Sequence, residues 1–198
     1  MNKVTVAKSA GFCFGVKRAV NLVYEAAAEH PGKVCTMGPI IHNEQVVNDL
    51  AEKGVHVIDD DLIRTDTGEK IERDNVIIIR SHGIPKNLME KVRDTGCEII
   101  DATCPFVRKI HDIVRDKSRE GFHIVIIGNP HHPEVEGIRG WAEGECTVIS
   151  CPEDALKLDI SKDIPLCIVS QTTFNYQKFK ELVEIIENME YHVVVTNT

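Results

Sequence analysis

The sequence lacks several features that would assign it to a large functional class. It contains no apolar run near the roughly 18 residues that a membrane-spanning helix needs. Its start, MNKVTVAKSAGFCFGV, has no long apolar stretch before a cleavage-like site, so we expect no signal peptide. Positive charge is also scarce, because 23 Lys and Arg face 31 Asp and Glu. Nucleic acids favour basic faces. We therefore expect a cytoplasmic protein with no membrane and no nucleic acid among its partners.

The sequence also lacks the common signatures of cysteine and nucleotide chemistry. Its seven cysteines form no C-x-x-C pair, and their number is odd. Disulfides are rare in the cytoplasm, so we expect most cysteines to be small buried residues and one or two to be ligands or reactive thiols. There is no G-x-G-x-x-G and no G-x-x-x-x-G-K-[ST] motif. Dinucleotide-binding and P-loop functions therefore have no support.

What the sequence does contain is an alternation of short β-branched runs with amphipathic helical patterns. Continuous apolar runs of this kind are typical of parallel strands covered on both faces. We predict an α/β fold of two similar small units with parallel sheets and flanking helices, comprising residues 1–100 and 101–198. The polar segment Asp59–Asp74 is expected to be a surface loop. The expected strands are Val4–Val6, Val34–Met37, Val55–Ile58, Val76–Ile79, Ile99–Ile100, Ile124–Ile127, Thr147–Ile149, Leu166–Val169 and Val193–Val195.

Chemically active side chains gather in the polar turns that follow these strands. Ligands bind open α/β sheets outside the carboxyl ends of the strands, so these turns are where function is expected. The turns read AGFCFG, GPIIHN, RSHG, DATCP, HHPEVEG and SQTT. They carry the candidate site residues Cys13, His42, His82, Cys104, His132, Glu134 and Thr172.

Cys13 and Cys104 share one setting, because each comes directly before a predicted helix. A helix N-terminus favours thiolate over thiol, and Lys17 and Arg18 add positive charge beside Cys13. Thiolate is the form that binds iron or zinc. The residues alone leave two alternatives open: a pair of metal ligands, or two small buried side chains.

The turn histidines and their neighbours also have a functional and a structural interpretation. His42, His82 and His132 could hold a diphosphate through N–H donors, or could simply be exposed. Glu134 could deliver a proton, and Thr172 could relay one or bind an alcohol. The alternative is a charged turn. His131, His132 and Glu134 also resemble loose zinc ligands. Five further histidines have no such placement and are expected to be structural: His30, His56, His111, His123 and His192.

Taken together, the segments AGFCFGVKRAV, GPIIHNEQVV, RSHGIP, DATCPFVRKIH, HHPEVEG and SQTT resemble the IspH (LytB) family of 4-hydroxy-3-methylbut-2-enyl diphosphate reductases. The resemblance implies three similar α/β units around a central [4Fe-4S] cluster, of which this chain covers the first two. The strand expected at Val4–Val6 could belong to the third unit. Cys13 and Cys104 match two of three cluster ligands. The third cysteine is expected just after HVVVTNT, so we expect a C-terminally truncated member that is inactive alone.

The resemblance also implies roles for the other candidates. His42, His82 and His132 would bind the substrate's diphosphate, Glu134 would deliver a proton, and Thr172 would lie near the substrate alcohol. The implied reaction gives isopentenyl and dimethylallyl diphosphate, with electrons from a carrier such as ferredoxin or flavodoxin. Two competing hypotheses remain: a zinc- or thiol-dependent module that binds a phosphorylated metabolite without redox chemistry, and a silent fragment that merely folds.

Overall fold

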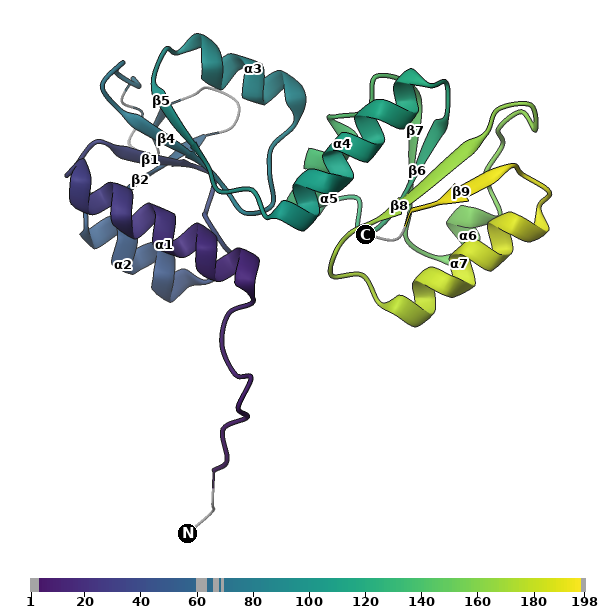
Figure 1. Cartoon of the computed structure of the whole chain (residues 1–198), viewed down its shortest axis with the longest axis horizontal. Coiled ribbons are helices and arrows are strands. Elements are labelled where there is room, and N and C mark those ends of the chain that lie inside the picture. The colour runs from purple at the N-terminus through teal and green to yellow at the C-terminus, as the bar shows by residue number, and fades with distance from the viewer. Residues whose placement is uncertain (1–3, 60–63, 66–67, 69, 197–198) are drawn as a thin grey trace.

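The computed structural model describes residues 4–59, 64–65, 68 and 70–196, which form two α/β units in succession along the chain (Figure 1). The helices are α1 (Phe14–Glu29), α2 (Glu44–Glu52), α3 (Lys86–Asp94), α4 (Pro105–Arg119), α5 (Pro133–Arg139), α6 (Pro152–Ala155) and α7 (Tyr176–Asn188). The strands are β1 (Val34–Met37), β2 (His56–Asp59), β3 (Arg64–Thr65), β4 (Val76–Ile79), β5 (Glu98–Asp101), β6 (His123–Ile127), β7 (Cys146–Ile149), β8 (Leu166–Ser170) and β9 (Val193–Val195).

The first sheet has the strand order β3-β2-β1-β4-β5, and all its pairings are parallel except that of β3 with β2. Every residue of β4 is buried, as its unbroken VIII run predicts. Successive side chains point to opposite faces. Val76 and Ile78 therefore pack on the side of α1 and α2, while Ile77 and Ile79 pack on the side of α3.

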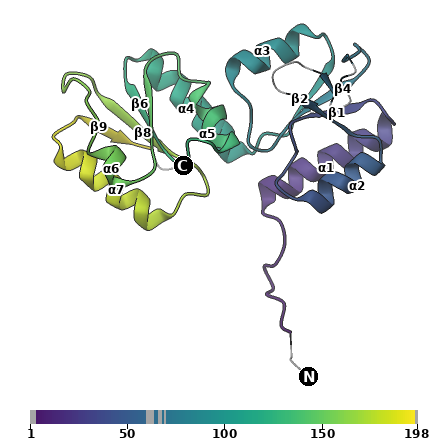
Figure 2. The same cartoon turned by 180° about the vertical axis from the view of Figure 1, so that it is seen from behind.

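The second sheet repeats this plan with the order β7-β6-β8-β9, and all its pairings are parallel. Ile124 and Ile126 pack with α4 and α5, whereas Val125 and Ile127 pack with α6 and α7. Figure 2 shows the same two helical layers from behind. The predicted α/β fold with parallel sheets and flanking helices is thus confirmed.

Two predictions of local structure were wrong. Val4–Val6 belongs to no strand in the described part of the chain; Val4 and Val6 are 86% and 75% exposed, and their segment projects from the first unit (Figure 1). A β-branched run becomes a strand only where a neighbouring strand can pair with it. The segment Asp59–Asp74 was expected to be a loop, but it contains β3, which pairs antiparallel with β2. Two residues are too few to show an alternating pattern; residues 60–63, 66–67 and 69 lie outside the described residues.

The chain passes from one sheet to the other after β5, which pairs with β4. The next element, α4, packs on the second sheet through Ile110 and Val114. The division at residue 100 stays a prediction, although the sheets change over between Asp101 and His123. Within the described ranges, no helix combines the length and the apolar character needed to cross a membrane.

Candidate functional site

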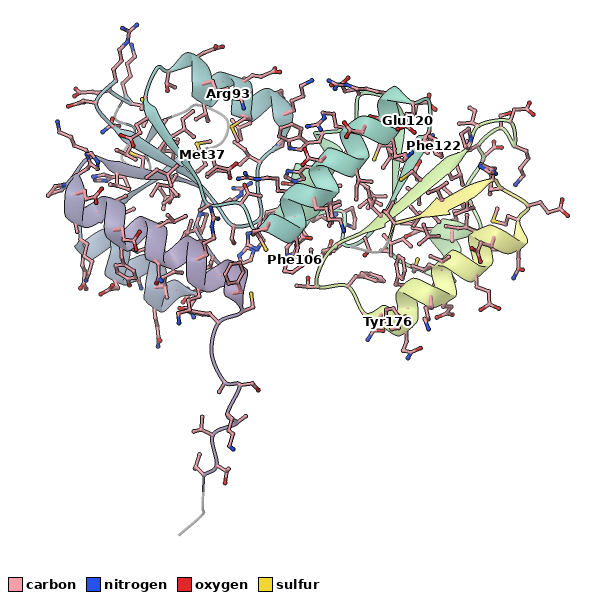
Figure 3. The ribbon with its side chains drawn as sticks, in the orientation of Figure 1. Met37, Arg93, Phe106, Glu120, Phe122 and Tyr176 are labelled. Atoms are coloured by element: carbon pink, nitrogen blue, oxygen red, sulfur yellow. The ribbon has the colours of Figure 1, made fainter. Side chains whose placement is uncertain are left out.

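The two thiols lie where the beginnings of α1 and α4 meet. Cys13 is the N-cap of α1 and Cys104 is the N-cap of α4, and neither side chain accepts a capping hydrogen bond. The Sγ atom of Cys104 packs against Gly15, where a Cβ atom would lie only 2.5 Å from the sulfur. Arg18 of α1 donates to the Thr103 carbonyl, directly before Cys104, at 3.4 Å and to the Asp101 carbonyl at the end of β5 at 3.1 Å. Figure 3 marks this region with Phe106 at the start of α4. The sequence thus brings together two helix N-termini that each carry a cysteine.

The other five cysteines lie elsewhere in the units. Cys35, Cys97 and Cys167 are buried, and Cys146 and Cys151 are half-buried. Burial raises the pKa of the Cys146 and Cys167 thiols to about 11, which keeps them protonated at neutral pH. Cys35 and Cys97 pack in the apolar core of the first unit, and Cys146 and Cys167 in that of the second, as expected from sequence for most of the cysteines. Cys151 is the N-cap of α6.

Three imidazoles from three different strand ends converge. His42 follows β1, His82 follows β4 and His132 follows β6, so both units contribute. The ring centroids are 4.7 Å apart for His42 and His82, 5.7 Å for His42 and His132, and 5.4 Å for His82 and His132. One nitrogen of each ring lies within 4.8 Å of the others. We call these three residues the imidazole cluster.

Hydrogen bonds of Ser81 connect the imidazole cluster with the thiol region. The Cys104 amide donates to the Ser81 carbonyl at 2.9 Å, directly before His82. The Ser81 hydroxyl in turn donates to the Ile40 carbonyl at 3.1 Å, in the turn that carries His42. A cavity of about 450 Å³ opens beside this turn and has His42 in its wall. The Cys104 thiol and the imidazoles of His42 and His82 therefore lie at the carboxyl ends of the strands of the first sheet, and His132 joins them from the second sheet.

The charge state of the imidazole cluster follows from its burial. Burial, and then the nearby His42, His132 and Arg80, lower the pKa of His82 to about 4. Burial is also the main cause of the lowered pKa of His132. Both rings are thus neutral at pH 7, and each carries one N–H. The Glu134 amide donates to Nδ1 of His132 at 3.1 Å, which places the proton of the neutral ring on Nε2.

This hydrogen bond decides what His132 offers to a ligand. A ring whose Nδ1 accepts a hydrogen bond presents an Nε2–H donor, which suits the oxygens of a phosphate. A metal ion would instead need a free lone pair. By distance alone the imidazole cluster could hold a metal. Among the residues that the structure describes, His131, His132 and Glu134 form no comparable group of ligand atoms, so the resemblance of this set to zinc ligands finds no support there.

Glu134 and Thr172 form a second, hydrogen-bonded part of the site. Glu134 begins α5 after β6 and is only 2% exposed, whereas Thr172 is an exposed residue after β8. The two carboxylate oxygens accept from Thr172, one from its amide at 2.6 Å and one from its hydroxyl at 2.9 Å. A buried carboxylate thus has an exposed hydroxyl as its link to the surface.

The sequence interpretation missed Arg80 at this site. Arg80 is 7% exposed and lies against Gly38, and its charge contributes to the low pKa of His82. His111 was expected to be structural, and it is buried against Gly83, next to His82. A signal for His111 was present: it lies four positions after Val107, on the apolar stripe of its helix.

Fold and site together define a class of protein. It is an α/β protein with two cysteines at helix starts and an imidazole cluster at the strand ends. The model of the LytB protein family matches residues 4–198, and the chain belongs to this family. The resemblance inferred from the sequence is therefore confirmed.

Relatives and solved structures agree with this assignment. The 4-hydroxy-3-methylbut-2-enyl diphosphate reductase of Caldanaerobacter subterraneus subsp. tengcongensis is 41% identical, over 99% of this chain and 66% of the relative. The reductase of Aquifex aeolicus is 43% identical, over 100% of this chain and 66% of the relative. A solved reductase of the same name, called the terminal enzyme of the non-mevalonate pathway, is 42% identical with a TM-score of 0.79, over 98% of this chain and 66% of that one. The solved structure of the Plasmodium falciparum reductase has a TM-score of 0.86 at 28% identity. The match covers 96% of this chain and 57% of that one. The chain thus spans about two thirds of the length of its relatives.

Proposed function

We propose that these residues form the first two units of an iron–sulfur reductase that acts on 4-hydroxy-3-methylbut-2-enyl diphosphate. The observation that carries the proposal is the imidazole cluster, which both units build and which backbone hydrogen bonds join to the Cys104 turn. The relatives of the chain carry the name of this reductase. An anion site beside paired thiols is what this substrate and a metal–sulfur cofactor together require.

The imidazole cluster binds the diphosphate end of the substrate in this proposal. His82 and His132 are neutral at pH 7, so each provides an N–H donor without the cost of burying a charge. The Nε2–H of His132 is set by the hydrogen bond at Nδ1. Arg80 adds a positive charge behind His82. These groups bind and orient the diphosphate so that the other end of the substrate points along the sheet edge.

Cys13 and Cys104 fit the cluster that the family resemblance implies. Neither sulfur is used as a helix cap, and Gly15 leaves room for the Cys104 sulfur that a Cβ atom would take away. Two helix N-termini also favour a negatively charged group at this place. These cysteines are two of the three cluster ligands that the resemblance implies. When bound, a [4Fe-4S] cluster would supply electrons and a Lewis-acidic iron at the substrate hydroxyl.

Glu134 and Thr172 hold and move the proton. The Thr172 hydroxyl contacts Glu134 on its buried side and is exposed on the other, so it can orient the substrate alcohol and pass a proton to it. The reaction takes up two electrons and two protons. One proton leaves with the hydroxyl group as water, and the other forms the new C–H bond of isopentenyl or dimethylallyl diphosphate. The electrons come one at a time from a carrier such as ferredoxin or flavodoxin.

The test uses the full-length parent protein purified without oxygen. Glu134→Gln should keep the cluster's absorption and iron content while lowering turnover by about two to four orders of magnitude, because a general acid contributes roughly that much. Glu136→Gln is the matched control, since Glu136 is an exposed carboxylate in the same turn. If the Glu134 variant keeps most of its activity while the control behaves like wild type, the proton-delivery role is wrong.

A second candidate function rests on the 4.8 Å separation of the imidazole nitrogens. This distance would allow a zinc-dependent module that binds a phosphorylated metabolite without redox chemistry. The Nδ1 hydrogen bond of His132 opposes it, because that ring would have to change tautomer. Metal analysis of the full-length protein separates the two functions: a brown protein with iron and sulfide supports the reductase, and a colourless protein with bound zinc supports the module.

A further inference from the structure

The turn that carries His82 is packed directly against helices of the other unit. Gly83 has φ of +71°, and a Cβ atom on it would lie 2.4 Å from Cε1 of His111 in α4. A Cβ atom on Gly140, just after α5, would lie 2.3 Å from Cβ of Pro85. Real Cβ contacts do not come this close, so the two glycines permit an approach that any other residue would prevent. The turn and the second unit are thus in tight contact on both sides of Ile84.

Hydrogen bonds across the same junction fix the turn in direction as well as in distance. The Trp141 indole N–H donates to the Ile84 carbonyl at 2.9 Å, and the Lys86 amide donates to the Gly140 carbonyl at 3.3 Å. Next to these bonds the junction contains a cavity of about 140 Å³ with His111 and Trp141 in its wall. Packing between the units is therefore incomplete here, so these few contacts matter for the position of the turn.

His111 is placed to support the turn rather than to bind a ligand. Its side chain is 4% exposed, and its ring stacks on Trp141 at 5.4 Å and 18°. Burial, together with Arg108 and against an opposite effect of Asp101, lowers the pKa of His111 to about 4, so the ring is neutral. Its Nε2 atom has no hydrogen-bond partner among the residues that the structure describes, and it faces Gly83 and Gly137. The ring therefore supports the turn by van der Waals packing and not by a hydrogen bond.

We propose that His111 and Trp141 form a clasp that positions the His82 turn, so that the imidazole cluster is complete only while the two units are held together. His111 and Trp141 are positioning residues in this proposal, because they act through Gly83 and Ile84 and do not touch the ligand. The inference rests on the proposed function, since it assumes that the imidazole cluster binds a diphosphate. By linkage, a ligand that bridges His82 and His132 must also stabilise the clasp.

Trp141 gives a direct readout, because it is the only tryptophan of the chain. Inorganic pyrophosphate serves as the probe, with affinity measured by calorimetry and clasp closure by acrylamide quenching of Trp141 fluorescence. In the unchanged chain, pyrophosphate should reduce the quenching constant about twofold. His111→Ala should increase quenching in the free protein, weaken pyrophosphate binding at least tenfold and remove the protective effect of the ligand. Circular dichroism should confirm that the variant keeps its helices.

His123→Ala is the matched control. His123 is also a buried histidine whose pKa is lowered mainly by burial, but it lies at the start of β6 and contacts Thr147 instead of the clasp. It should destabilise the second unit without changing pyrophosphate affinity or ligand protection of Trp141. Trp141→Phe is the conservative variant, because it keeps an aromatic ring at this position and loses the indole N–H. It should weaken binding by about threefold, less than His111→Ala does.

The outcomes separate the clasp from the proposed function. If the unchanged chain does not bind pyrophosphate, the anion site itself is wrong, and the positioning role is overturned with it. If the chain binds pyrophosphate and His111→Ala binds it equally well, only the clasp is wrong. If His111→Ala does not fold, an unchanged affinity in Trp141→Phe overturns the clasp, and a weakened affinity supports it.

Discussion

The turns that carry His132 and His82 reach the same site by different means. His132 is fixed within its own unit: it caps α5 by accepting from the Glu134 amide, and Pro133 starts the helix directly after it. The His82 turn is closed locally by the Gly83 amide, which donates to the Arg80 carbonyl at 2.9 Å, but this bond does not involve the imidazole. Contacts of Gly83 and Ile84 with residues of the second unit place the turn relative to His132.

This difference separates two sources of order in one site. A local hydrogen bond orients a ring as soon as the helix forms, whereas contacts between units orient a ring only after the units have docked. The geometry of the imidazole cluster therefore depends on tertiary structure at one histidine and on secondary structure at another. Four experiments can test or sharpen this comparison.

The largest effect is expected for Gly83→Ala. The new Cβ atom would meet His111 and would also impose left-handed strain at φ of +71°. We expect the free energy of unfolding to fall by about 3 kcal/mol. Gly121→Ala is the control, because Gly121 has φ of +88° and no atom of the described part of the chain lies within 4 Å of its Cβ position; it should cost only about 1 kcal/mol. Urea unfolding measures both, and equal losses would refute the role of the contact between units.

Acid should weaken the fold through His82. Its pKa is lowered to about 4, so the folded chain keeps this ring neutral while the unfolded chain protonates it near 6.5. The stability contribution is present above pH 6.5 and is lost as the pH falls toward 4. Between pH 7 and 4.5 we expect a loss on the order of 2 kcal/mol from this group. His82→Asn should remove this part of the pH dependence of urea unfolding, and an unchanged slope would contradict the assigned burial.

Thr172→Val tests the hydrogen bond between Thr172 and Glu134, on the side of the site that carries His132. It removes the hydroxyl that donates to Glu134 and leaves a buried carboxylate oxygen without that donor. We expect a loss of about 1.5 kcal/mol in the free energy of unfolding, because hydrogen bonds to charged groups contribute about this much. Thr172→Ser keeps the hydroxyl and should restore most of it. Identical losses in the two variants would show that the hydroxyl is not responsible.

The smallest effect on stability is expected from substitutions of His132. His132→Ala removes the cap of α5 and should cost about 1 kcal/mol, whereas His132→Asn keeps a good N-cap acceptor and should cost almost nothing. Both remove the imidazole N–H, so both should weaken pyrophosphate binding in calorimetry. Full binding by His132→Asn would mean that His132 acts only as a cap.

The sequence predicts the sheets well wherever a strand is apolar on both faces. Val34–Met37, Val76–Ile79 and Val193–Val195 are strands with the predicted bounds. Where prediction was wrong, at Val4–Val6 and at β3, pairing with a neighbour decided the outcome rather than the local pattern. Such pairing depends on residues far along the chain, which periodicity does not contain.

The site is predictable from sequence to the same degree. The strand-end turns identify His42, His82 and His132, and the structure brings them together. The helix starts identify Cys13 and Cys104, whose helix ends meet at Gly15. His111 could not be assigned in the same way, because its place under Gly83 depends on how two units dock. Local patterns thus predict which residues converge, but they do not predict what holds them in place.

The space needed by the Cys104 sulfur restricts a residue far away in the sequence, Gly15. It belongs to the first helix, yet the limit on its size is set by a sulfur atom that follows the last strand of the first sheet. A mutation at this codon would act on the second thiol while both cysteines stayed unchanged. Replacing one hydrogen atom by a methyl group at position 15 would therefore displace the Cys104 sulfur from its place against α1.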